Sequence, residues 1–111
     1  DCSEGGIGVA AAEIAFSGGL GLDVDLRAVP RGQAVSDSVT ALFSESNSRF
    51  LMEVKAGCED RFEATMGGVP CARIGTLTES PGFVVTGLEG TRVVDSDINT
   101  LKASWQAPLS F

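Results

Sequence analysis

The feature that most constrains the fold is a predicted helix that begins on three glycines. Apolar residues recur at i, i+4, i+7 and i+8 and predict a helix over residues 4–17, whose buried stripe is Ile7, Ala11, Ile14 and Ala15. Three glycines, Gly5, Gly6 and Gly8, fall in its first turns. Each costs about 1 kcal/mol of helix stability relative to alanine. This start therefore needs a reason, either close packing of the backbone or a bound ligand.

The two ends of this helix carry further signals. Ser3 is predicted to cap the N-terminus through its hydroxyl, and Gly18–Gly19 to end the helix with a left-handed residue. Asp1 stands directly before the Gly-rich turn, without a lead of disordered residues. We therefore expect the chain to be part of a longer one.

Strands and helices alternate along the rest of the chain. Alternating or short apolar runs predict strands over residues 20–26, 50–54, 69–77, 83–88 and 91–94, the last two as a hairpin. Helices are predicted over residues 38–43 and 58–66 and from Ser96 to Pro108. Trp105 falls on the apolar stripe of the last helix and is interpreted as a core residue. These elements favour one α+β domain over residues 1–111, with helices packed on a mixed or antiparallel sheet.

The composition excludes several kinds of chemistry. The 111 residues contain no histidine, which removes the usual general base, the commonest metal ligand and every Ser–His or Cys–His pair. A formal charge of −7 disfavours nucleic acids and membrane surfaces as partners. Three cysteines without a CxxC spacing are interpreted as reduced thiols of a cytoplasmic protein. Acidic residues are expected on solvated faces, namely Asp23, Asp25, Glu59, Asp60 and Glu63.

The Gly-rich turn is the first segment that could carry chemistry. Glycines at a helix N-terminus leave backbone N–H groups uncovered, and the helix dipole adds partial positive charge there. A phosphate could bind at this turn, and Asp1 could hold a Mg²⁺ that bridges to it. The alternative is a tight turn in which glycine only allows close packing of the helix.

A polar loop between a predicted helix and a predicted strand is the second segment. Residues 44–48 read Ser-Glu-Ser-Asn-Ser, with Arg49 directly after them. Their hydroxyl and amide groups could contact a sugar or a phosphate, with Glu45 and Arg49 as charged anchors. The alternative is a capped turn in which Asn47 and the serines bond to nearby backbone groups.

These two segments also carry a family resemblance. The runs DCSEGGIGVAAAEIAFSGGLGLDVDL and LFSESNSRFLMEV, ARIG at residues 72–75 and the closing LKASWQAPL follow one another along the chain. Together they resemble the C-terminal end of the large subunit of phosphoribosylformylglycinamidine synthase, in the aminoimidazole ribonucleotide synthetase-like superfamily. The resemblance runs from Asp1 to near Phe111 and implies most of the last α+β domain of that enzyme, without its opening strand and helix.

The resemblance implies an activity for the parent enzyme. In this family ATP activates the amide oxygen of formylglycinamide ribonucleotide, and ammonia from glutamine displaces the phosphate to give the amidine. The implied cofactors are ATP or ADP and Mg²⁺ in the parent enzyme, with none required by the isolated chain. The implied partners are the remaining domains of the parent chain, a glutaminase subunit and a small accessory subunit, all in the cytoplasm.

Individual residues also receive implied roles. Asp1 matches a metal-binding Asp of the family's first half, and Glu45–Asn47 match a Glu-Ser-Gln that contacts substrate there. We expect no catalytic residue in this chain, metal at Asp1, and a phosphate-facing rim of Ser3, Gly5, Gly6, Glu45, Ser46 and Asn47. Asn47 replaces the Gln, and the SRF that follows looks like the second half, which is associated with an auxiliary nucleotide site or a structural role.

Two other interpretations remain open at this point. The chain could belong to another superfamily member, such as a selenophosphate synthetase, a thiamine-phosphate kinase or a hydrogenase-maturation protein, although SWQAPL and FSES favour the purine enzyme. It could instead be a structural module whose Gly-rich turn serves only packing. We expect the isolated chain to be inactive and to form a homo-oligomer through an uncovered apolar face.

Overall fold

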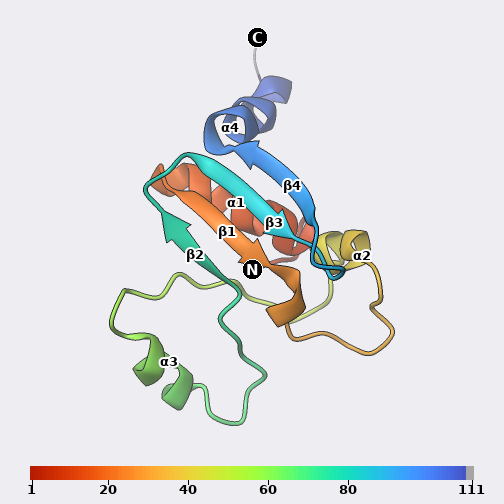
Figure 1. Cartoon of the computed structure of the whole chain (residues 1–111), viewed down its shortest axis with the longest axis vertical. Helices are drawn as coiled ribbons and strands as arrows, with labels where there is room; N and C mark the ends of the chain where they lie inside the picture. Colours follow the sequence, from red (N-terminus) through yellow and green to blue (C-terminus); the bar gives the residue numbers. More distant parts are fainter. Residues whose placement is uncertain (110–111) are drawn as a thin grey trace.

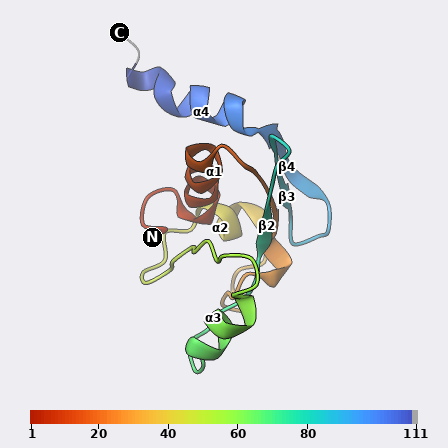
Figure 2. The ribbon, with the colours of Figure 1, turned by 90° about the vertical axis from the view of Figure 1, so that its left-hand side faces the viewer.

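The structure, a computed structural model, describes residues 1–109. Its helices are α1 (Gly6–Gly18), α2 (Ser38–Phe43), α3 (Glu59–Thr65) and α4 (Ile98–Gln106), and its strands are β1 (Gly21–Asp25), β2 (Gly75–Thr78), β3 (Gly82–Thr86) and β4 (Arg92–Asp97). The strands form one sheet in the order β2-β1-β3-β4. Helices α1 and α2 lie on one face of this sheet, whereas α3 stands apart below it and α4 extends above it (Figure 1 and Figure 2).

The sheet is mixed, as the sequence predicts. Strands β1 and β3 run parallel, while the pairs β1–β2 and β3–β4 are antiparallel. The parallel pair follows from the long excursion between β1 and β3, and the antiparallel pair β3–β4 is the expected hairpin. The expected α+β class is therefore confirmed.

The core lies between the inner face of the sheet and α1. Alternate residues of the central strands point inward, with Leu22 opposite Phe83 and Val24 opposite Val85. These side chains are buried together with one side of α1, which contributes Ile7, Ala11, Ala15 and Phe16. Alanines on the helix let it approach the sheet closely, since a small side chain keeps the two backbones near each other.

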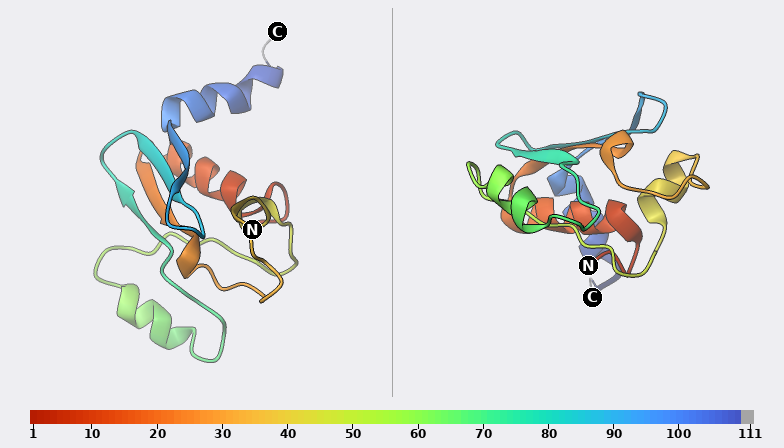
Figure 3. Two further views of the ribbon diagram at one scale, coloured as in Figure 1. Left: turned by 45° about the vertical axis from the view of Figure 1, so that its right-hand side comes forward. Right: turned by 90° about the horizontal axis from the view of Figure 1, so that it is seen from below.

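The prediction of a strand over residues 50–54 is wrong. Backbone pairing in the described chain is confined to β1–β4, and residues 50–54 form an irregular segment. This segment runs along α1 on the side away from the sheet, as the right-hand view of Figure 3 shows. Leu51 packs against the core, whereas Phe50 and Met52 are exposed. The alternating pattern predicted Phe50 and Met52 on the apolar face, whereas the structure turns Leu51 inward. A strand also needs a neighbouring strand to bond with, and α1 cannot take that place.

Helix ends and strand lengths differ in smaller ways. The N-cap of α1 is Gly5 and not Ser3, and the helix ends at Gly19 in the left-handed region, as predicted. The last helix begins after Asp97, which caps it, and not at Ser96. The long strand predicted over residues 69–77 is reduced to β2.

An arginine outside helix α3 forms ion pairs with two of its carboxylates. None of the residues of α3 is buried. Arg73, in the segment that leads into β2, donates to Glu63 Oε1 and to Asp60 Oδ1, both at 2.6 Å. Asp60 and Glu63 are therefore exposed to solvent, as expected, but both are also paired with an arginine. The sequence did not predict this pairing. Such an exposed ion pair contributes about 1 kcal/mol or less to stability.

The glycines at the start of α1 have a packing role. A Cβ added at Gly6 would lie 2.6 Å from the carbonyl oxygen of Leu42 and 2.9 Å from Cα of Phe43, at the end of α2. Gly6 also has φ of 66°, which other residues rarely adopt. At Gly8 a Cβ would lie 3.1 Å from the ring of Phe43. The first turn of α1 therefore lies backbone to backbone against α2.

Replacing Gly6 tests this contact. Gly6→Ala should lower the free energy of unfolding by about 2–5 kcal/mol, because overpacking costs about 1–3 kcal/mol and a left-handed backbone about 1–2 kcal/mol. Gly18→Ala is the matched control, since nothing lies within 4 Å of an added Cβ there. It should leave stability unchanged or raise it by up to about 1 kcal/mol. Urea unfolding measures both, and a Gly6→Ala chain as stable as wild type would contradict the packing.

Two helices start on the same capping pattern. Asp37 accepts a hydrogen bond from the backbone N–H of Thr40 at 2.8 Å, and Asp97 accepts one from the N–H of Thr100 at 2.9 Å. The threonine hydroxyls donate to the same carboxylates. These bonds favour the charged form, so the pKa of Asp37 and the pKa of Asp97 lie below the ordinary value of 3.8.

The caps predict a dependence of stability on pH. Because both carboxyls have a lowered pKa in the folded chain, their contribution is present above pH 3.8 and is lost as the pH falls through the folded pKa values. Asp97→Asn can still accept the bond from Thr100 but cannot titrate. In urea unfolding between pH 7 and pH 2, its stability should therefore fall less steeply than that of wild type below pH 3.8. Parallel curves would contradict this account of the cap.

Candidate functional site

The turn before α1 is folded onto its own first residue. Oδ1 of Asp1 accepts a hydrogen bond from the backbone N–H of Ser3 at 3.0 Å and another from the Ser3 hydroxyl. Ser3 is therefore turned toward Asp1, which explains why it does not cap α1. Both side chains are exposed. The predicted metal residue and the first predicted rim residue are thus adjacent in space as well as in sequence.

The two motif segments are joined by the backbone of Cys2. Its side chain is 1% exposed, and its N–H donates to the carbonyl oxygen of Arg49 at 3.0 Å. This bond fixes the start of the Gly-rich turn beside the end of the serine-rich loop. The other cysteines, Cys58 and Cys71, are also free.

A second link is made by Glu45. Its Oε1 accepts a hydrogen bond from the N–H of Gly5 at 2.8 Å, so a side chain forty residues away caps α1 in place of Ser3. A carboxylate is favoured at this position because the helix dipole places partial positive charge on the first N–H groups. The sequence predicted that the two segments face each other, and the structure brings them together. The cap itself has no local spacing by which a sequence pattern could identify it.

The glycine backbone is covered more than the sequence suggests. Gly6 is buried against α2, and the N–H of Gly5 is bonded to Glu45. The expectation of a run of uncovered N–H groups therefore does not describe this turn. The exposed polar groups of the rim are side chains, namely Ser3, Glu45, Ser46 and Asn47.

The serine-rich loop is held by few bonds of its own. The hydroxyls of Ser44 and Ser46 lie 3.0 Å apart, and Ser48 has φ of 61°. Within residues 1–109 no side-chain bond to the backbone is made by Asn47 or the three serines of this loop, so the capped-turn interpretation does not describe it. Arg49 donates to the carbonyl oxygen of Pro30 at 3.4 Å, which is a long bond.

The Gly-rich turn and the serine-rich loop carry several oxygen-bearing side chains, and most of their charged side chains are carboxylates. Asp1, Glu4 and Glu45 are all exposed carboxylates of the two segments. Among the described residues no group of three or more His, Cys, Asp or Glu side chains gathers closely enough to hold a metal by itself. Mg²⁺ usually takes only one or two carboxylates and completes its shell with water and phosphate. Asp1, the residue predicted to hold metal, carries one exposed carboxylate.

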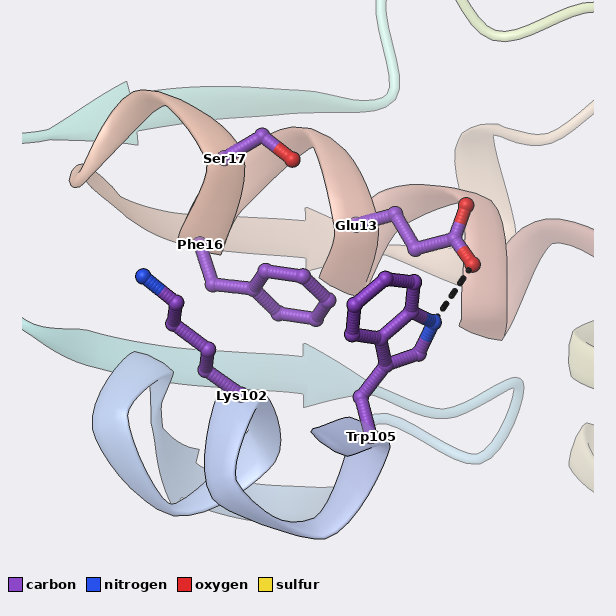
Figure 4. A pocket seen from close by; sticks show the side chains of 5 residues that line it. All are labelled: Glu13, Phe16, Ser17, Lys102 and Trp105. Atoms are coloured by element: carbon purple, nitrogen blue, oxygen red, sulfur yellow. Dashed lines mark hydrogen bonds between the residues drawn. The ribbon is translucent and has the colours of Figure 1, made fainter. Parts of the chain in front are cut away.

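Two shallow hollows lie along the outer side of α1. One, of about 270 Å³, is lined by Asp1, Ala10, Glu13, Ile14, Ser17 and Leu51. The other, of about 330 Å³, lies between α1 and α4 and is lined by Glu13, Phe16, Ser17, Lys102 and Trp105 (Figure 4). Glu13 and Ser17 line both, so the hollows adjoin along one face of the helix.

Trp105 is not the core residue that its spacing predicted. It is 53% exposed, and its indole N–H donates to Oε1 of Glu13 at 3.1 Å. Its ring packs on Phe16 with the centroids 5.7 Å apart and the planes tilted by 51°. The ring of Trp105 on α4 faces Phe16 and Glu13 on α1 (Figure 4), so this contact joins the two helices. In the part of the chain that the structure describes, no helix is long and apolar enough to cross a membrane.

The chain is similar to one subunit of the same enzyme from different organisms. The subunit PurL of phosphoribosylformylglycinamidine synthase from Deinococcus radiodurans is 34% identical over 109 residues, which cover 98% of this chain and 14% of that protein. The corresponding subunit from Methanothermobacter marburgensis is 45% identical over 76 residues, which cover 68% of this chain and 10% of that protein. The chain therefore spans a small part of the length of these relatives.

A solved structure has the same fold. PurL from T. maritima, complexed with ATP, superposes with a TM-score of 0.78 at 23% identity over 91% of this chain and 18% of that one. The model of the family described as AIR synthase related protein, C-terminal domain, matches residues 1–87, which include the Gly-rich turn, the serine-rich loop and three of the four strands. The chain belongs to this family of AIR synthase related C-terminal domains.

Proposed function

We propose that this chain is a C-terminal α+β module of an ATP-dependent ligase, phosphoribosylformylglycinamidine synthase. That enzyme would convert formylglycinamide ribonucleotide, ATP and ammonia from glutamine to the amidine in purine biosynthesis. The observation that carries the proposal is the similarity to PurL subunits over 98% of the chain, at 34% identity. Because these relatives are PurL subunits, the similarity favours the purine enzyme over the other superfamily members.

The contribution proposed for this module is a phosphate-facing rim. The two links at Cys2 and Gly5 support it, since they join the Gly-rich turn to the serine-rich loop. The groups that would contact a phosphate or substrate are the hydroxyls of Ser3 and Ser46 and the amide of Asn47, with the backbone of Gly5 and Gly6 and the carboxylate of Glu45 shaping the surface. None of these groups transfers a proton or attacks an atom, so catalytic groups would come from other domains.

The charge of the rim determines which form of phosphate it would accept. Exposed carboxylates repel a bare phosphate, whereas Mg²⁺ between a carboxylate and a phosphate turns repulsion into attraction. Asp1 would hold the ion, and the carboxylate of Glu45 would add negative charge to the rim. Bound Mg²⁺ would neutralise phosphate charge, and the residues of this chain would orient the phosphate. The proposed ligand is therefore a magnesium nucleotide, ATP or ADP, and not a free anion.

The parent enzyme would bring this module together with further domains and subunits. The remaining domains of the parent chain, a glutaminase subunit and a small accessory subunit would be its partners, in the cytoplasm. Ammonia has to be delivered from glutamine without loss to water, which is the reason for a glutaminase partner.

A structural role is the second candidate. The packing of Gly6 against Leu42 supports it, because the glycines have a use without any ligand. In that case the module would complete the parent enzyme by shape, or its nucleotide would be an auxiliary one that is not consumed. The two candidates differ in whether the rim binds a nucleotide.

Calorimetry with ADP separates the two candidates. If the rim is a nucleotide site, Mg·ADP should bind with a dissociation constant of about 1 mM or below. ADP without Mg²⁺ should bind at least about tenfold more weakly, because the rim is acidic. Glu45→Gln can still accept the bond from Gly5 but removes the charge, and it should weaken Mg·ADP binding by about tenfold. Glu4→Gln, which makes the same change in net charge outside the proposed rim, is the control.

The outcomes of this experiment are distinct. Binding that depends on Mg²⁺ and on Glu45 supports the rim. No binding of Mg·ADP by a folded wild-type chain would leave the structural role. An equal loss in Glu4→Gln would show a general effect of charge and would also contradict the rim.

The isolated chain should have no ligase activity. It contains no histidine and, on this proposal, no catalytic group. An assay with ATP, Mg²⁺, ammonia and formylglycinamide ribonucleotide should give no amidine above the blank. Product that scales with the concentration of the purified chain would contradict this prediction.

A further inference from the structure

The two asparagines of the sequence lie in different settings. Asn47 lies in the serine-rich loop directly before Ser48, and Asn99 lies in the first turn of α4 directly before Thr100. An asparagine loses its side-chain amide without an enzyme when the backbone nitrogen of the next residue attacks its side-chain carbonyl carbon. This attack requires a nitrogen that is free of hydrogen bonds and a backbone that can rotate. The local structure therefore decides which asparagine reacts.

Asn47 and Ser48 meet both requirements. The two residues form an exposed turn. Within residues 1–109, neither the side-chain amide of Asn47 nor the backbone N–H of Ser48 takes part in a hydrogen bond. The side chain of Ser48 is small, so it leaves its own backbone nitrogen accessible to the neighbouring amide. No bond has to be broken before the attack.

Asn99 is held away from the same reaction. The backbone N–H of Thr100 donates to Oδ1 of Asp97 at 2.9 Å, and the threonine hydroxyl donates to Oδ2 at 2.8 Å. The attack would have to break the first of these bonds and turn the start of α4 out of its helical conformation. Folding should therefore slow the reaction at Asn99 by about tenfold or more, because a hydrogen bond to a charged group is lost first.

We propose that Asn47 is a site of spontaneous deamidation in the folded chain. The nitrogen of Ser48 gives its proton to a base in the solvent and forms a bond to Cγ of Asn47. The bond between Cγ and Nδ2 breaks, and Nδ2 leaves as ammonia, so that a succinimide ring remains. Water then opens this ring. The net change is amide plus water to carboxylate plus ammonium, with water as the only co-reactant.

The ring opens to two products. Hydrolysis of the new bond at Cγ restores the original backbone and leaves an aspartate in place of Asn47. Hydrolysis of the original peptide bond leaves an isoaspartate, whose backbone runs through the former side chain and is longer by one carbon. Each product adds one negative charge to a chain whose net charge is already −7.

The modified residue lies between two links that it does not form itself. Glu45 accepts the bond from Gly5, and the carbonyl oxygen of Arg49 accepts the bond from Cys2. Asn47 contributes to neither. The deamidated chain should therefore stay folded and change only the charge and course of the serine-rich loop. This reactivity goes beyond the proposed function and does not depend on a bound nucleotide.

Peptide mass spectrometry tests the proposal by comparing folded and unfolded chain. Both are incubated at the same mildly alkaline pH, the unfolded one in guanidinium chloride, and are then digested with trypsin. Cleavage after Arg49 and Arg92 puts Asn47 and Asn99 on different peptides. Folding should change the rate at Asn47 by less than about threefold, because the turn opens at little cost. It should slow Asn99 by about tenfold or more.

Comparing each asparagine with itself removes the influence of the residue that follows it. If folding slows Asn47 by tenfold or more, or if Asn99 reacts in the folded chain as fast as in the unfolded one while Asn47 does not, the proposal is overturned. The unfolded chain sets the time scale, so a folded chain whose Asn47 stays intact over that time also overturns it.

A variant of the following residue provides the second test. Ser48→Gly suits the φ of 61° at this position and exposes the backbone nitrogen further. It should speed the reaction at Asn47 and leave the rate at Asn99 unchanged, with circular dichroism showing that the variant is folded. Asn47→Gln is the matched blank, and the more acidic forms that ion exchange separates from aged wild type should be absent from it. Acidic forms that persist in Asn47→Gln would place the modification elsewhere and contradict the proposal.

Discussion

The close approach of the first turn of α1 to the end of α2 is the contact on which the rest of the arrangement depends. Because Gly6 has no side chain, its backbone lies against the carbonyl of Leu42 and Cα of Phe43. The chain leaves α2 directly beside this contact, so the serine-rich loop begins next to the Gly-rich turn. The bonds from Cys2 to Arg49 and from Gly5 to Glu45 are then within reach. Helix stability is lost at the glycines, and tertiary packing offsets it.

The same contact determines the electrostatics of the candidate site. Glu45 occupies the positive end of α1, so the helix dipole acts on a side chain of the chain itself and not on an open anion site. In the proposed function the exposed acidic groups around this turn would accept a phosphate only when a cation accompanies it. Packing and binding are therefore compatible uses of the glycines. A tight turn holds the acidic groups in place, and a magnesium nucleotide would contact the groups exposed around it.

The sequence predicted the fold class, the boundaries of most helices and the two segments of the candidate site. These features depend on local periodicity, on glycines that end helices and on motif order. It failed where distant residues decide the outcome. Glu45 replaces Ser3 as the cap of α1, Trp105 contacts Glu13 from an exposed position, and residues 50–54 lie against a helix and not a strand. No periodicity encodes these contacts, because each joins positions far apart in the sequence.

A nuclear Overhauser experiment on the labelled chain can detect the contact between the first turn of α1 and the end of α2. An α-proton of Gly6 lies where an added Cβ would be 2.9 Å from Cα of Phe43, and the amide of Gly5 lies against the side chain of Glu45. We therefore expect strong cross-peaks from Gly6 Hα to Phe43 Hα and from the Gly5 amide proton to the γ-protons of Glu45. A folded chain whose spectrum shows both glycines without contacts to residues 42–45 would contradict this packing.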